Sequence, residues 1–149
     1  MKKLKVGIIG YGIVGKRRRI FIDQNSDLEI VCVCDVRFLE DDFRNDIGKV
    51  HSNYDVIEDL SSEKSVSGRL EDGVKFYSDY HFLLSENKLD MIFVCLPNYL
   101  ASEATIQSLK KGCHVFCEKP PGRTVQDIIN VREQESKNKS LKLKYGFNH

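Results

Sequence analysis

Residues 4–35 of the chain read LKVGIIGYGIVGKRRRIFIDQNSDLEIVCVCD, and this stretch decides the fold. The apolar run Leu4–Ile9 predicts a strand, residues 13–23 predict a helix, and the second apolar run, Leu28–Cys34, predicts another strand. Both runs are almost continuously apolar, as are strands that a parallel sheet buries on both faces. Glycines stand at positions 10, 12 and 15, between the first strand and the helix. A strand, a glycine-rich turn and a helix in this order are typical of a doubly wound α/β domain.

Each glycine of the turn has a steric reason. Gly10 permits the tight turn, Gly12 lets a pyrophosphate approach the backbone, and Gly15 lets the helix pack closely on the strand. The helix N-terminus adds unpaired N–H groups and a partial positive charge. The turn is therefore predicted to bind the pyrophosphate of a dinucleotide through Gly10, Tyr11, Gly12, Ile13, Val14 and Gly15. A structural turn that binds nothing is the alternative interpretation.

An acidic residue follows the second strand at the distance that dinucleotide binding requires. Asp35 lies twenty residues beyond Gly15 and is predicted to accept hydrogen bonds from the adenosine ribose diol. A 2′-phosphate would place like charge beside this carboxylate, so NAD is favoured as the cofactor. Arg37 keeps NADP open, because it lies two residues further on and could reach such a phosphate; a solvated loop arginine is the alternative.

Strands and helices alternate along the rest of the chain, which predicts a Rossmann-type, mostly parallel sheet with helices on both faces. Residues 1–149 are expected to form one dinucleotide-binding domain, because the length suits one domain and not two. The polar stretch at about 50–73 is expected to be a mobile surface insertion that alters cofactor access, contacts a partner or merely decorates the surface. Further strands are expected at 74–77, 91–96, 114–118 and 141–147, and helices at 38–47, 79–86 and 102–111 and after Thr124.

Two helix starts carry recognisable caps. Asp79 is expected to cap a helix that Asn87 ends. Thr124, with Asp127 three residues later, predicts a capping box. The apolar face of that last helix is expected to contain Val125, Ile128 and Ile129.

Composition excludes several classes of protein. The net charge is +1, so no overall field draws the chain to nucleic acid or to anionic membranes. The basic run at 16–19 lacks interleaved aromatic residues and is interpreted as an exposed helix start, one of whose side chains could lean toward the phosphates. No apolar stretch approaches the length of a membrane span. The five cysteines are odd in number and lack zinc-site spacing, which favours a reducing, cytoplasmic setting and no bound metal.

Two later strand ends extend the predicted site. The sequence VCLPN at 94–98 ends one strand, and FCEKP at 116–120 ends the next. Ligands of open parallel sheets lie at the carboxyl ends of the strands, so both segments are predicted to flank the nicotinamide half of the cofactor. An ordinary exposed ion pair before a proline-rich turn is the alternative interpretation of Glu118 and Lys119, and their spacing leaves both open.

These segments resemble the glucose-fructose oxidoreductase, inositol dehydrogenase and MocA-type (Gfo/Idh/MocA) family. The resemblance covers nearly the whole chain: VGIIGYG at 6–12, LPNYL at 96–100, KGCHVFCEKP at 111–120 and YGFNH at 145–149. The third segment is the most specific of these. The last resembles the family's exit from its nucleotide domain into a substrate domain.

The resemblance implies roles for particular residues. Leu96, Pro97 and Asn98 would line the cofactor groove, and Glu118 would contact the nicotinamide ribose. Lys119 would lie at the hydride-transfer site as the catalytic residue of this domain, where it would position a substrate hydroxyl and ease removal of its proton. Asn148 would touch the nicotinamide end, and the Lys119–Pro120 peptide bond would be cis.

The family implies hydride transfer between a nicotinamide cofactor and a hydroxyl-bearing carbon of a sugar or cyclitol ring, including nucleotide sugars. Its usual catalytic aspartate and histidine come from a second domain, and His51, His81, His114 and His149 do not match them. We therefore expect this chain to bind the cofactor but to be inactive without a substrate domain. The family also implies that the parent is a homo-oligomer that assembles through that domain, whereas this chain alone is expected to be monomeric.

Two other functions stay open from the sequence. A non-catalytic NAD(H)-sensing domain would explain the missing substrate domain, although it has no obvious use for Glu118 and Lys119. A methyltransferase also combines a glycine turn with a ribose-binding acid, but it would not require this strand end.

Overall fold

The computed structural model describes residues 2–39, 56–58 and 64–147. The strands are β1 (Leu4–Ile9), β2 (Leu28–Cys34), β3 (Val56–Glu58), β4 (Lys64–Arg69), β5 (Lys75–Tyr77), β6 (Met91–Val94), β7 (His114–Glu118) and β8 (Leu143–Gly146). The helices are α1 (Ile13–Gln24), the 3₁₀ helix η1 (Val36–Leu39), α3 (Tyr80–Glu86), α4 (Asn98–Lys110) and α5 (Val125–Ser136).

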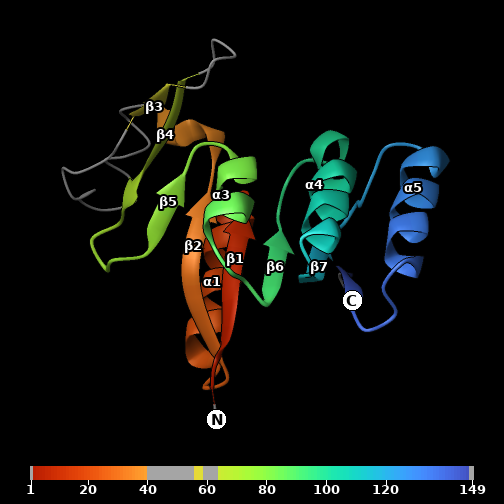
Figure 1. The fold of residues 1–149 in the computed structure, drawn as a ribbon, viewed down its shortest axis with the longest axis horizontal. Helices are drawn as coiled ribbons and strands as arrows, with labels where there is room; N and C mark the ends of the chain where they lie inside the picture. The colour runs from red at the N-terminus through yellow and green to blue at the C-terminus, as the bar shows by residue number, and fades with distance from the viewer. Residues whose placement is uncertain (1, 40–55, 59–63, 148–149) are drawn as a thin grey trace.

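The strands form one sheet in the order β3-β4-β5-β2-β1-β6-β7-β8. All neighbours from β5 to β8 pair in parallel, and the strand order reverses at β1, which lies between β2 and β6. Ile9 is level with both Cys34 and Val94, so β1, β2 and β6 end together at one edge of the sheet (Figure 1). This reversal is the position at which open α/β sheets bind ligands.

Helices cover both faces of the sheet, as predicted. In Figure 1 the helices α3 and α4 lie in front of the sheet and α1 lies behind it. Each face has its own apolar core: Ile9, Ile92 and Val94 pack with the α3 and α4 side, and Val6 and Ile8 pack with the α1 side. The side chains of β1 alternate between the two cores because successive strand residues point to opposite faces.

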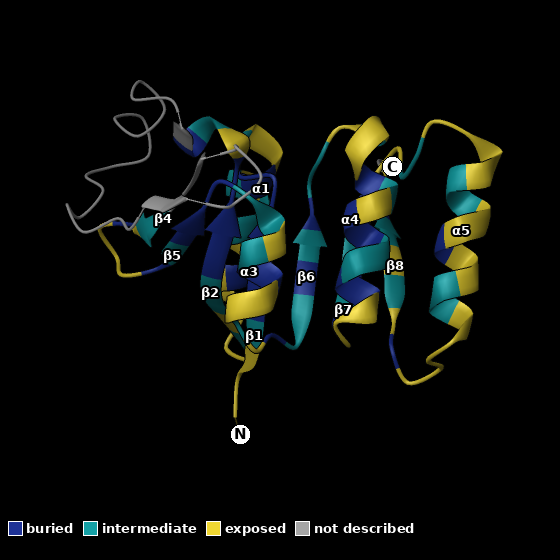
Figure 2. Ribbon diagram, turned by 45° about the horizontal axis from the view of Figure 1, so that its top comes forward, coloured by how far each residue is buried: buried dark blue, intermediate teal, exposed yellow. Residues whose placement is uncertain are grey.

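The predicted caps are confirmed, but the predicted apolar face of α5 is wrong. The Asp79 carboxylate accepts a hydrogen bond from the backbone of α3, and Thr124 and Asp127 form the reciprocal capping box of α5. Val125, however, is 77% exposed, whereas Val131 is 1% exposed. Helix α5 packs against α4 at one end of the domain and keeps most of its surface in water (Figure 2), so its inward direction is set by α4 and not by the sheet.

Two strands that the sequence did not predict lie within the polar stretch at 50–73, whose role as a surface insertion stays a prediction. Residues 64–69 form β4, which pairs antiparallel with β5, and β3 pairs with β4. The sequence KSVSGR lacks the alternating apolar residues that indicate a strand, so the antiparallel pairing with β5 could not be predicted from it. Residues 40–55, which include most of the helix expected at 38–47, lie outside the described residues.

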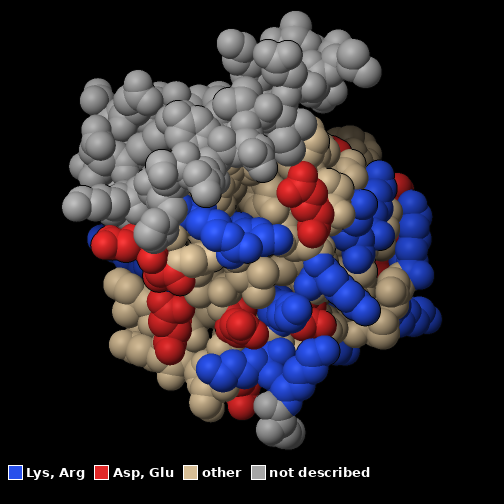
Figure 3. All heavy atoms as spheres, turned by 60° about the vertical axis from the view of Figure 1, so that its left-hand side comes forward, with Lys and Arg blue, Asp and Glu red and all other residues tan. Residues whose placement is uncertain are grey.

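Helix α4 begins at Asn98, four residues before the expected start at 102, with Pro97 as its N-cap residue. All five cysteines are free thiols, and Cys95 alone among them is not fully buried. On the face in Figure 3, basic side chains gather toward the right and the bottom of the view with a few acidic side chains among them, and other acidic side chains lie at the left. Within residues 2–39, 56–58 and 64–147, no helix has the length and apolar character that crossing a bilayer requires.

Candidate dinucleotide-binding site

The glycine turn is held against the ends of two neighbouring strands. The backbone N–H groups of Gly10 and Tyr11 both donate to the Cys34 carbonyl, at 2.8 and 3.0 Å. Gly10 has φ +92°, in the left-handed region, and a Cβ there would overlap the carbonyl group of Cys95 after β6. Both the backbone conformation and the close approach of β6 therefore require glycine at this position.

Helix α1 begins directly after this turn, at Ile13. A Cβ on Gly15 would overlap the Gly10 carbonyl oxygen, so the first turn of α1 lies on the backbone that precedes it. Gly12 is the N-cap and has no side chain to bond the first amides of the helix. Ile13 and Val14 are 75% and 43% exposed beside those amides. The uncapped amides and the absent side chains match what a pyrophosphate requires of a helix N-terminus.

The side chain of Tyr11 lies on the core side of the turn. It is 6% exposed, stacks on Phe38, and its hydroxyl accepts a hydrogen bond from Arg19 Nη1 at 2.9 Å. Burial raises the pKa of Tyr11 above its usual value. Any contact from Tyr11 to a dinucleotide must therefore come from its backbone.

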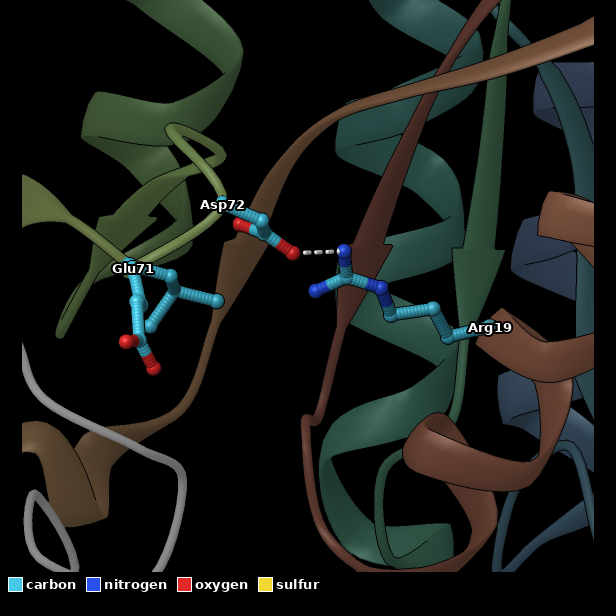
Figure 4. A pocket seen from close by; sticks show the side chains of 4 residues that line it. Arg19, Glu71 and Asp72 are labelled. Carbon is cyan, nitrogen blue, oxygen red and sulfur yellow. Dashed lines mark hydrogen bonds and ion pairs between the residues drawn. The ribbon is translucent and has the colours of Figure 1, made fainter.

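Arg19 extends from α1 to the turn between β4 and β5. It forms an ion pair with Asp72 at an open hollow that Leu70 and Glu71 also line (Figure 4). Its bond to Tyr11 ties this ion pair to the glycine turn. The hollow is separate from the glycine turn and the strand ends, so it is not the predicted cofactor site.

Asp35 lies immediately after β2, and its backbone N–H donates to the Tyr77 carbonyl of β5 at 3.0 Å. Its side chain is only 9% exposed. Arg37 donates to both carboxylate oxygens, from Nε to Oδ1 and from Nη2 to Oδ2, each at 3.0 Å. A Cβ on Gly12 would lie 2.8 Å from Nη2 of Arg37, so the guanidinium lies between the acid and the glycine turn. The structure thus brings Asp35 and Arg37, predicted to lie at the adenosine ribose, next to the glycine turn that is predicted to bind the pyrophosphate.

The segment after β6 borders the same edge. The Cys95 N–H donates to the Ile9 carbonyl at 2.7 Å, which holds this segment beside β1. Leu96 and Asn98 are half-buried, Pro97 is exposed, and α4 begins at Asn98. Burial raises the pKa of the Cys95 thiol to about 12, so this cysteine stays protonated at neutral pH.

The end of β7 places two adjacent residues in different surroundings. Lys119 is exposed, whereas Glu118 is 9% exposed and forms an ion pair with Arg18 of α1. The Lys119–Pro120 peptide bond is cis, as the resemblance implied. Asn148 lies outside the described residues. The sequence pointed to the basic run at 16–19 as a whole but not to Arg18 as the partner of Glu118, because no local pattern links residues 100 positions apart.

The reversal of strand order, the glycine turn under α1 and the acid after β2 define an open α/β dinucleotide-binding domain. The chain belongs to the Gfo/Idh/MocA oxidoreductase family, whose model, described as an NAD-binding Rossmann fold, matches residues 4–147. Family membership excludes the methyltransferase alternative. It also agrees with the resemblance drawn from the strand ends.

Two curated relatives are similar over nearly the whole chain. D-Glucoside 3-dehydrogenase of Escherichia coli K12 is 29% identical over 147 residues, which cover 98% of this chain and 35% of the relative. Myo-inositol 2-dehydrogenase of Thermotoga maritima is 29% identical over 145 residues, 97% of this chain and 36% of the relative. The chain therefore spans about a third of the length of these relatives.

A solved structure agrees with the fold. Scyllo-inositol dehydrogenase from Lactobacillus casei, determined with bound NAD(H) and scyllo-inositol, superposes with a TM-score of 0.72 at 22% identity, over 97% of this chain and 36% of that one. None of these comparisons supports a non-catalytic sensor.

Proposed function

We propose that this chain is the NAD-binding domain of a dehydrogenase that oxidises a hydroxyl-bearing carbon of a sugar or cyclitol ring. The observation that carries the proposal is the glycine turn, which lies between Asp35 at the end of β2 and Lys119 at the end of β7. The carboxylate of Asp35 suits an adenosine ribose at one end of this row of strand ends, and the cation of Lys119 at the other end suits a substrate hydroxyl. The dehydrogenases among the relatives support this class of substrate.

Backbone groups of this chain would hold the cofactor's charged centre. The amides of residues 12–15 start α1 without a side-chain cap and would bind the pyrophosphate, helped by the positive end of the helix dipole. Asp35 would accept hydrogen bonds from the ribose hydroxyls and share its carboxylate with Arg37. Leu96, Pro97 and Asn98 would line the nicotinamide half of the groove. The nicotinamide, when bound, supplies the hydride chemistry.

Lys119 is the residue of this domain that would act on substrate. Its exposed ammonium group can donate a hydrogen bond to a ring hydroxyl and stabilise negative charge on that oxygen as its proton leaves. Contacts of Glu118 with the nicotinamide ribose and of Asn148 with the nicotinamide end stay predictions. We further propose that a substrate domain supplies the catalytic acid–base pair, that the parent is a cytoplasmic homo-oligomer and that this chain alone turns over no sugar.

Equilibrium titration of the chain with NADH, followed by nicotinamide fluorescence, tests the proposal. Asp35→Ala is expected to weaken NADH binding by about 10- to 150-fold, because a hydrogen bond to a charged group is worth about 1.5–3 kcal/mol. The matched control is Asp27→Ala, which removes an exposed carboxylate from the turn before β2 and should change nothing. A chain that does not bind NADH, or that binds NADPH tenfold more tightly, would contradict the role given to Asp35.

A further inference from the structure

The ion pair between Arg18 and Glu118 connects the helix that begins at the glycine turn to the strand that ends at Lys119. Arg18 lies halfway along α1, and Glu118 is the last residue of β7. Nε of Arg18 donates to Oε1 of Glu118. The Glu118 side chain is 11% exposed, so its charge is largely removed from water and depends on this partner.

Aromatic rings fix the direction of the Arg18 side chain. Its guanidinium carbon lies 5.1 Å from the ring centroid of Phe116, two residues before Glu118 on the same face of β7. The Phe116 ring in turn packs on Phe93 of β6, at 5.1 Å between centroids. A planar guanidinium that stacks on one ring while it bonds a carboxylate has little freedom to move.

The carboxylate of Glu118 is also confined from β8. A Cβ on Gly146 would lie 2.7 Å from Oε2 of Glu118, so this carboxylate packs directly on the backbone of the neighbouring strand. The Cys95 thiol lies within electrostatic reach of both Glu118 and Arg18. The ion pair therefore lies among β6, β7, β8 and α1, on the opposite side of β1 from Asp35.

We propose that Arg18 is a positioning residue for the nicotinamide end of the site: by holding Glu118 it sets where the adjoining Lys119 segment lies relative to α1. This inference rests on the proposed function. Lys119 follows Glu118 directly at the end of β7, so the contacts that hold the Glu118 side chain also fix the strand end from which the lysine extends. The adenosine end, formed by Asp35 and the glycine turn, contains neither partner of the ion pair.

Paired titrations with NADH and ADP separate the two ends of the site, because ADP retains the adenosine and diphosphate groups but lacks the nicotinamide ribose and nicotinamide. Arg18→Met is expected to weaken NADH binding about tenfold while ADP binding changes less than twofold, because Glu118, which is predicted to contact the nicotinamide ribose, loses the partner that holds it. Glu118→Gln, which keeps the shape of the side chain, should give at least as large a selective loss, because it breaks the ion pair and also changes the carboxylate that is predicted to contact the nicotinamide ribose. The double variant should be no worse than Glu118→Gln alone, because Arg18 is proposed to act only through Glu118.

Arg17→Met is the matched control, because Arg17 is exposed on the same helix and its loss removes the same charge. Melting temperatures identify a variant that fails to fold; if Arg18→Met fails, Arg18→Lys and Glu118→Gln carry the test. If Arg18→Met weakened the binding of NADH and of ADP equally, the inference would be overturned, since Arg18 would then act on the phosphates. Unchanged NADH binding, or additive effects in the double variant, would also overturn it. A wild-type chain that binds ADP and NADH poorly would instead refute the proposed function, and the inference with it.

Discussion

Two glycines in this chain share a backbone conformation but differ in what surrounds them. Gly10 has φ +92° and Gly73 has φ +85°, and both are in the left-handed region. A Cβ on Gly73 would meet nothing within 4 Å, whereas a Cβ on Gly10 would overlap the Cys95 carbonyl group. The pair therefore separates the cost of the backbone conformation from the cost of close approach in the glycine turn.

Alanine at each position should show the difference. Gly73→Ala is expected to lower the free energy of unfolding by about 1–2 kcal/mol, the cost of a left-handed backbone for an L-residue. Gly10→Ala should cause the same loss and a further loss of about 1–3 kcal/mol, because its Cβ must displace the backbone after β6. The losses are then about 1–2 and about 2–5 kcal/mol, or about 2–8 °C and about 4–20 °C in melting temperature for a domain of this size. Only Gly10→Ala should weaken the binding of NADH, because it alone shifts the backbone of the glycine turn.

Urea denaturation followed by circular dichroism, together with NADH titration, measures both effects. The two variants should share the wild-type m-value, so that a change in midpoint reports a change in stability. Equal losses of stability in the two variants, or normal NADH binding by a folded Gly10→Ala variant, would refute the reasoning that the approach of β6 shapes the turn.

Three other outcomes are expected. Thr124→Ala should lower stability by about 0.5–2 kcal/mol through loss of the hydroxyl that caps α5. Hydrogen bonds from the backbone of Thr124 and Arg123 lower the pKa of Asp127, so the separate contribution of the Asp127 carboxylate should be full above about pH 4 and lost as the pH falls through that lowered value, in urea titrations at several pH values. Burial raises the pKa of Cys32 and Cys95 to about 12, so iodoacetamide at pH 8 should label them slowly in the native state, and stability should fall as the pH rises from about 8.5 toward 12. Arg37→Ala should widen the preference for NADH over NADPH by about tenfold in paired titrations, because it removes the cation that neutralises the ribose-binding carboxylate.

The sequence predicted the central fold well because that part of the chain is locally encoded. The apolar runs of β1, β2, β6 and β7, the glycines of the turn and the caps at Asp79 and Thr124 act through their immediate neighbours. The places of Asp35, Leu96 and Lys119 at strand ends were predicted from the parallel topology, and the structure has them there; their roles toward the cofactor and substrate stay predictions. The errors fall where order comes from outside the segment: β4 depends on pairing with β5, and the inward face of α5 depends on α4.

Periodicity and spacing alone determined that the chain forms a doubly wound domain with a dinucleotide turn, because hydrophobic burial and glycine conformation are properties of short stretches. Tertiary structure decided which partners the charged side chains have. Arg37 closes over Asp35, Tyr11 turns into the core, and Arg18 reaches Glu118 across 100 residues of sequence. The contacts of Tyr11 with Phe38 and of Arg18 with Glu118 join elements that meet only after the sheet has assembled, so no local pattern records them. Arg37 and Asp35 are only two residues apart, but the sequence left open whether the arginine turns back onto the acid or stays in solvent.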